Sequence, residues 1–217
     1  MSVHMEQDQT TGQKRDRGAV LVCLAGAALA IVVVPLMGGL SGDTGAEVTD
    51  QLVAGAGKIQ VAALVATLSA VALLFASVRL GRAIGGVTGG LATAAGTGVS
   101  LMLAAYYSAF AAGAVVSTVL ISSPSPAIGE STLLMINLAE LTRYAPGTAL
   151  LAAAVLARRV LPKPLMIVAV VLLALTFVPF STWLVAIVVP IWLGVAGAVV
   201  GPWRLDGLDH RVPTARA

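Results

Sequence analysis

The sequence predicts an all-α fold, a polytopic membrane helix bundle with six transmembrane helices and both ends in the cytoplasm. Of its 217 residues, 58% are hydrophobic and 11% are charged, whereas a typical soluble domain is about 45–50% apolar and about 25% charged. The apolar residues form runs whose lengths are close to the roughly 20 residues that a membrane-crossing helix needs. Several of these runs are apolar all round, and they lack the alternation of a transmembrane β-strand.

One transmembrane domain, residues 18–203, is expected between two cytoplasmic tails. Its six spans are expected at about 18–40, 59–79, 91–121, 133–157, 165–179 and 183–201. Residues 1–17 are polar and predict a disordered tail, and residues 204–217 form the charged second tail. The longest loop is the polar segment 41–57, and a short glycine-rich turn is expected at 81–90.

Prolines mark the later span boundaries. The third span is longer than one crossing needs, so it is expected to tilt or to project beyond the membrane. Pro124 and Pro126 interrupt the apolar sequence after it, because proline lacks an N–H and disfavours helix just before it. Pro162 and Pro164 bracket the turn before span five, and Pro179 closes that span.

The placement of basic residues predicts the orientation. With the N-terminus inside, 11 of the 13 Lys and Arg residues lie on the inner side, as the positive-inside rule requires. The two exceptions are Lys58 and Arg143, which fall on the outer half. Trp183 and Trp203 flank the last span, as interfacial anchors do.

Residues 14–41 also permit a second interpretation, a cleaved signal peptide. They have a basic start, an apolar core and the small residues Gly39 and Ser41. The apolar stretch exceeds a usual signal core, which favours a retained span. The other five spans keep their orientation in either case.

The outer half of span four holds the most informative polar residues. Glu140 and Arg143 are three positions apart and share a helix face, so they can pair. Ionisable residues inside a span usually face the bundle interior or water, although a surface pair that snorkels to the interface remains an alternative. Pro146 predicts a kink beside them. The candidate polar vestibule consists of Lys58, Tyr106, Tyr107, Asn137, Glu140, Arg143 and Tyr144.

Familiar catalytic and cofactor motifs do not fit this chain. Residues 39–42 spell the GxSG of rhomboid-type intramembrane proteases, but the only histidines are His4 and His210, both in the tails. The segment 85–90 (GGVTGG) lacks the lysine of a phosphate-binding loop. We therefore expect no catalytic, cofactor-binding or metal-ligating residues and no enzyme. The scattered basic residues also argue against nucleic-acid binding.

Span three carries small residues at every fourth position. Such a stripe lets two helices approach closely. The stripe consists of Thr88, Ala92, Gly96, Ser100, Ala104, Ser108 and Ala112. It indicates a packed face, within the bundle or against other membrane proteins or a second copy.

Three segments carry a resemblance to known sequences: residues 57–60 (GKIQ), 105–107 (AYY), and 137–140 (NLAE) with 143–146 (RYAP). With the overall pattern of residues 18–203, the chain resembles small multi-pass integral membrane proteins of GC-rich bacteria that have no assigned function. The resemblance implies a bacterial cytoplasmic membrane, and it brings no substrate or cofactor.

Three functions are compatible with the sequence. The first is a non-catalytic subunit or regulatory partner in the cytoplasmic membrane, since catalytic motifs are missing and a packing face is present. The second is a small transporter or channel-like unit with a polar site in the outer leaflet. The third is an intramembrane enzyme acting on lipid, which would need Glu140 as acid or base. An arginine partner at Arg143 would hold that carboxylate ionised.

Overall fold

The chain folds into an all-helical bundle. The computed structural model describes residues 3–37, 44–120, 125–178 and 182–200, without the side chains of 3–16, 37, 120, 139–143 and 182–183. In these residues the elements are α1 (Val3–Met37), α2 (Gly45–Ala54), α3 (Ala56–Ile84), α4 (Gly86–Val115), the π-helical turn η1 (Val116–Leu120), α5 (Pro126–Leu156), α6 (Lys163–Leu175) and α7 (Thr182–Val199).

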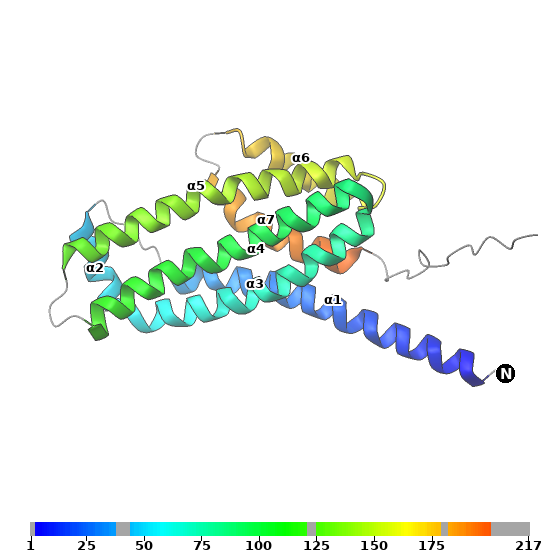
Figure 1. Cartoon of the computed structure of the whole chain (residues 1–217), viewed down its shortest axis with the longest axis horizontal. Helices are drawn as coiled ribbons and strands as arrows, with labels where there is room; N and C mark the ends of the chain where they lie inside the picture. The colour runs from blue at the N-terminus through cyan, green and yellow to red at the C-terminus, as the bar shows by residue number, and fades with distance from the viewer. Residues whose placement is uncertain (1–2, 38–43, 121–124, 179–181, 201–217) are drawn as a thin grey trace, which may run out of the picture.

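Long helices lie side by side along the long axis of the molecule (Figure 1). Helix α4 packs between α3 and α5, while α1 packs against α3 and α7. The α3–α4 turn, the α5–α6 connection and the end of α7 lie at one end of the bundle, and α2 lies at the other (Figure 1).

Three described helices are long and apolar enough to cross a membrane. They are Arg17–Leu36 in α1, Ala56–Ile84 and Gly86–Val119. Tyr144–Leu156, Lys163–Leu175 and Leu184–Val199 are shorter apolar helices. Helix α6 has 13 residues, which at ~1.5 Å each give about 20 Å. With 13 residues, α6 is shorter than the predicted span five at 165–179.

The hairpin of α3 and α4 turns more sharply than the sequence predicts. Gly85 and Gly86 at the turn have positive φ, 73° and 57°, a conformation that glycine adopts without steric cost. The two helices absorb most of the predicted 81–90 turn. A side chain at Gly81 would collide with Thr93, and one at Gly96 would place its Cβ 2.8 Å from the Cβ of Ser77. Glycine at these positions lets the two backbones approach.

Helices α1, α3 and α7 meet through glycines in the same way. A Cβ at Gly26 would lie 2.9 Å from the Cβ of Ala72, and one at Gly197 would lie 2.7 Å from that of Ala76. The Ser69 hydroxyl donates to the carbonyl of Gly26 at 2.8 Å. Together with the α3–α4 hairpin, these contacts form what we call the close-packed end.

A buried arginine ties two helices together there. Arg79 of α3 is 3% exposed. Its Nε donates to the carbonyl of Gly197 and its Nη2 to that of Val200, both at 2.9 Å. The last carbonyls of a helix lack backbone donors and carry partial negative charge, so a guanidinium stabilises them. Arg79 therefore caps the end of α7 as well as marking the inner side in the charge pattern.

A short helix occupies the segment that the sequence predicts as the 41–57 loop. In α2 the Thr44 hydroxyl accepts from the Glu47 N–H at 3.3 Å and caps the helix. Val48 and Leu52 lie one turn apart and are buried. Thr44 with Glu47 is half of a capping box, and the apolar pair supplies a buried face. These two signals identify the helix, and the polar composition obscured them.

Helix α2 docks tightly on the start of α5. A Cβ at Gly129 would collide with the carbonyl of Gly45. The Thr49 hydroxyl donates to the Gly45 carbonyl at 2.8 Å and accepts from the Gly129 N–H at 3.1 Å. Helix α5 itself begins at Pro126 behind its cap Ser125, earlier than the predicted start at 133. This contact fixes α2 across the end of the bundle.

Two further expectations differ from the structure. Helix α1 continues to Val3, whereas the sequence predicts disorder for residues 1–17; extending a formed helix costs far less than starting one. In the small-residue stripe, Ala92, Gly96 and Ser100 are buried, but Ser108 and Ala112 are exposed. Only the first half of the stripe thus packs inside the bundle.

Candidate functional site

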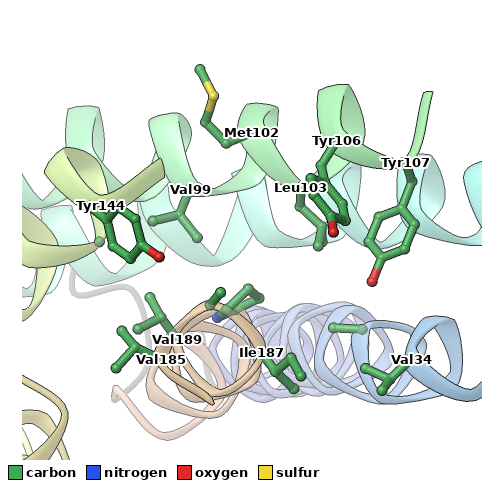
Figure 2. Close-up of a pocket in the computed structure, with 14 residues that line it drawn as sticks. Val34, Val99, Met102, Leu103, Tyr106, Tyr107, Tyr144, Val185, Ile187 and Val189 are labelled. Carbon is green, nitrogen blue, oxygen red and sulfur yellow. The ribbon is translucent and has the colours of Figure 1, made fainter. Parts of the chain in front are cut away.

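A cavity lies between α4 and α5 on one side and α1 and α7 on the other (Figure 2). It is lined by Ala30, Val34, Val99, Met102, Leu103, Tyr106, Tyr107, Tyr144, Gly147, Val185, Ala186, Ile187, Val189 and Pro190. We call it the tyrosine cavity. Its volume is about 60 Å³, against roughly 10–15 Å³ for one water, while an engineered cavity of about 150 Å³ binds benzene. The space therefore suits a few waters or a slim ligand.

Three tyrosines provide the polar groups of the lining. Tyr106 and Tyr107 extend from α4 and Tyr144 from α5, and their hydroxyl groups point toward α1 and α7 (Figure 2). Tyr107 is 9% exposed and packs with Val33 and Ala66. A tyrosine hydroxyl both donates and accepts hydrogen bonds.

Tyr106 lines the cavity and also packs against the buried cluster that includes residues of α2. The centroid of its ring lies 5.2 Å from that of Tyr107 and 5.3 Å from that of Phe110, and both pairs are edge-to-face. Edge-to-face pairs at this distance are favourable arrangements of aromatic rings. Phe110 belongs to the buried cluster that contains Val48 and Leu52 of α2. The tyrosines are thus held from behind by packed side chains.

Prolines and a glycine shape the wall on α5 and α7. Pro190 lies inside α7 and lines the cavity together with Ala186. It has no N–H, so the carbonyl of Ala186, four residues earlier, loses its usual helical donor. On α5, a Cβ at Gly147 would meet only the Val189 Cγ1, at 4.0 Å. Pro190 thus interrupts the hydrogen bonding of the α7 wall, and the α5 wall has room beside Gly147.

Pro146 has a packing role one position away. A Cβ at Gly98 of α4 would lie 2.8 Å from the Cβ of Pro146. The proline ring therefore occupies the room that the glycine leaves, and it brings α5 close to α4. This contact gives Pro146 a packing role between α4 and α5, at the position where the sequence predicts a kink.

The predicted vestibule residues separate into three groups. Tyr106, Tyr107 and Tyr144 line one cavity. Lys58 and Asn137 are exposed and do not line it. The side chains of Glu140 and Arg143 lie outside the described residues, so their pairing and their direction stay predictions.

Sequence reasoning missed the contributions of α1 and α7. Ala30, Val34 and the segment from Val185 to Val189 are ordinary apolar residues, and nothing in their type separates a cavity wall from a lipid-facing surface. Pro190 was the available signal, since an intramembrane proline marks a carbonyl that needs another partner. Among the residues whose side chains the structure describes, those that line the cavity are uncharged.

Comparison of the chain with protein-family models, with curated proteins and with solved structures finds no match in any of the three. The functional argument therefore rests on the residues themselves. Within the described part of the chain, no group of three His, Cys, Asp or Glu residues is placed to hold a metal ion.

Proposed function

We propose that this chain is a six-span protein of a bacterial cytoplasmic membrane, with both termini inside, and that it is a non-catalytic binding unit. The tyrosine cavity carries the proposal, because side chains from four helices converge there around a space with hydrogen-bonding groups. Ligand sites in helical membrane proteins are typically such mostly apolar cavities with a few placed polar groups. A transporter that carries the ligand across the bilayer would bind it at the same cavity.

The topology is supported by the arrangement of charge along the bundle. Arg82, Arg158, Arg159 and Lys163 flank the α3–α4 and α5–α6 connections, which share one end of the molecule (Figure 1). A common basic end is what the positive-inside rule expects of the cytoplasmic side. The cavity then falls in the outer half, because its α7 residues follow closely on the start of that helix at Thr182.

Cysteine labelling tests the topology. Cys23 is the only cysteine and is buried, so a Cys23→Ala background is suitable. In intact cells, an impermeant maleimide should label cysteines placed at Thr44 or Ser125 and leave those at Arg159 or Gly85 unlabelled. Labelling at Arg159 in intact cells would contradict the inside assignment. A cysteine at the exposed Phe177, beyond the short α6, should be labelled if α6 completes a fifth span, and its protection would contradict six spans.

Ligand-dependent stabilisation tests binding. A ligand that binds only the folded state stabilises it by about 2.7 kcal/mol at 100 times its dissociation constant. A total lipid extract and a water-soluble extract of the producing cells are added separately to purified protein, and thermal unfolding is followed. One extract should raise the Tm of the native chain and leave Gly147→Leu unchanged.

Gly90→Leu is the matched control for that comparison. A Cβ at Gly90 meets no atom within 4 Å, and Gly90 lies outside the cavity lining. This variant should respond to the active extract as the native chain does. An equal response of Gly147→Leu and the native chain would remove the cavity from the proposal.

A role as a subunit of a larger assembly is the second candidate. The exposed residues Ser108 and Ala112 favour it, since small residues on a lipid-facing helix permit close approach of a partner helix. Crosslinking from an Ala112→Cys variant in membranes tests it. A crosslinked partner that is lost in Ala112→Leu supports a subunit, and a chain that stays uncrosslinked opposes it.

A further inference from the structure

The turn between α5 and α6 carries three exposed cations in a short segment. Arg158, Arg159 and Lys163 lie within six residues and are all exposed. The turn itself is held in place, because the Val160 N–H makes a backbone hydrogen bond of 2.9 Å within it. Leu161 is 5% exposed and packs into the largest buried cluster. With Leu161 anchored inward, the three cations stay on the outside of the bundle.

Helix α6 presents an exposed apolar face in line with Lys163. Ile167 follows Lys163 by four residues and Val171 follows Ile167 by four, so the three share one side of the helix. Ile167 is 59% exposed and Val171 is 52% exposed. Ala169 and Leu172, on the opposite side, are buried. A cation followed by apolar side chains matches the order of phosphate and hydrocarbon in a phospholipid.

The length of α6 brings lipid headgroups toward these cations. As the fifth span of the proposed topology, α6 covers about 20 Å with its 13 residues, whereas the hydrocarbon core is about 30 Å thick. A short span is accommodated by thinning of the bilayer and by flanking side chains that extend to the interface. Phosphate groups beside α6 therefore come within reach of Lys163 and the two arginines. Arginine binds phosphate through two parallel N–H···O bonds.

We propose that the α5–α6 turn and the exposed face of α6 bind an anionic phospholipid. Its phosphate lies on Arg158, Arg159 and Lys163, and an acyl chain lies along Ile167 and Val171. Basic side chains at a membrane surface favour lipids with a net negative charge. The proposal uses the membrane arrangement assigned above and adds a second site, since the tyrosine cavity is lined from α1, α4, α5 and α7.

Photocrosslinking from α6 tests the site. The full-length protein, with photoreactive benzoylphenylalanine at Ile167, is placed in nanodiscs that hold equal amounts of phosphatidylglycerol and phosphatidylcholine with identical chains. Captured lipids are identified by mass spectrometry. Phosphatidylglycerol should exceed phosphatidylcholine at least about tenfold, because each basic residue near anionic lipid contributes about fivefold in affinity. The same probe at Leu101 of α4, 53% exposed, should capture the two lipids about equally.

Two matched double variants assign the selectivity to the turn. Arg158→Gln with Arg159→Gln should lower the lipid ratio at least about fivefold. Arg17→Gln with Arg82→Gln removes the same charge from exposed arginines of α1 and α3 and should keep the ratio. Gly147→Leu, which alters the tyrosine cavity, should also keep it. Thermal unfolding in detergent should be similar in both double variants, since all four arginines are exposed.

A lipid bound at the turn also bears on the lipid-extract comparison of the cavity. A ligand that binds the folded state raises the Tm wherever it binds, so an anionic lipid would stabilise Gly147→Leu as well. That comparison is therefore made with Arg158→Gln, Arg159→Gln and Lys163→Gln present in each chain. The Tm difference then reports the tyrosine cavity alone.

The outcomes separate this site from the function proposed above. Equal capture of the two lipids at Ile167, or an equal loss of selectivity in Arg17→Gln with Arg82→Gln, overturns the site and leaves the cavity untouched. Selectivity that appears only after Asp206→Asn with Asp209→Asn identifies the C-terminal tail as the occupant and overturns the lipid. Displacement of phosphatidylglycerol by soluble glycerol phosphate overturns the acyl-chain contact. Both leaflets of the nanodisc hold the same lipids, so the result does not depend on which side the turn faces.

Discussion

Two regions of this bundle, the close-packed end and the tyrosine cavity, use glycine in opposite ways. At the close-packed end, the place of a missing side chain is taken by a neighbouring helix, as where Gly197 meets Ala76. At the tyrosine cavity, the place beside Gly147 stays open, with the nearest atom 4.0 Å from a would-be Cβ. The same residue type thus brings helices together in one region of the molecule and leaves space in the other.

The difference separates stability from function. Close contacts between helices are the main source of association inside a membrane, where lipid is as apolar as the side chains. The end around Arg79 concentrates these contacts, and the largest buried cluster extends from there to Val99, Val185 and Val189 in the cavity wall. At Gly147 the cavity lacks such a contact, and its lining carries tyrosine hydroxyls. Substitutions in the two regions should therefore differ in both size and sign.

The largest effect is expected from Arg79→Ala. It removes two hydrogen bonds from a charged donor to the end of α7, each worth about 1.5–3 kcal/mol. We expect a loss of about 3 kcal/mol in unfolding free energy, measured by denaturant titration in mild detergent. Arg158→Ala, at an exposed arginine of the same end, should change little. Equal stability of the two variants would remove the capping role of Arg79.

A smaller effect is expected where a methyl group is added. Gly197→Ala forces a Cβ to within 2.7 Å of the Ala76 Cβ and should cost about 2 kcal/mol, as overpacking does. Gly147→Ala should instead stabilise by about 0.5 kcal/mol, because alanine favours helix over glycine and the space is available. If both substitutions shift the unfolding midpoint in the same direction, the contrast between the close-packed end and the cavity is wrong.

The smallest effect concerns α2. Thr49→Val removes the acceptor for the Gly129 N–H and should cost about 1 kcal/mol. Hydrogen exchange should rise in α2 and at the start of α5 and stay unchanged at the close-packed end. Thr67→Val is the control, since Thr67 is exposed and its hydroxyl donates to the Ala63 carbonyl of its own helix. Faster exchange throughout the bundle would show that α2 is not an independent cap.

Sequence patterns predicted the long helices because hydropathy and length act locally. The basic residues, the prolines and the glycines of the hairpin each mark the end of a helix to within a few residues. Helix α2 escaped because its apolar face is only two residues, Val48 and Leu52, inside a polar segment. Its capping sequence from Thr44 to Glu47 was readable, and it was the stronger signal.

The site was only partly predictable for a different reason. Aromatic and charged residues of the outer half stand out in a sequence, and the three tyrosines do meet in one cavity. The walls from α1 and α7 come from packing between distant segments, and a valine that faces lipid looks the same as one that faces a cavity. Depth alone also grouped Lys58 with the tyrosines, although its side chain is exposed.

The central claim is that the tyrosine cavity is a ligand site, and native mass spectrometry tests it most directly. Protein released from mild detergent is compared as the native chain, Gly147→Leu and Gly90→Leu. The native chain and Gly90→Leu should retain a small molecule that Gly147→Leu lacks. An identical set of retained molecules in all three, with all three folded, would contradict a binding role for the cavity.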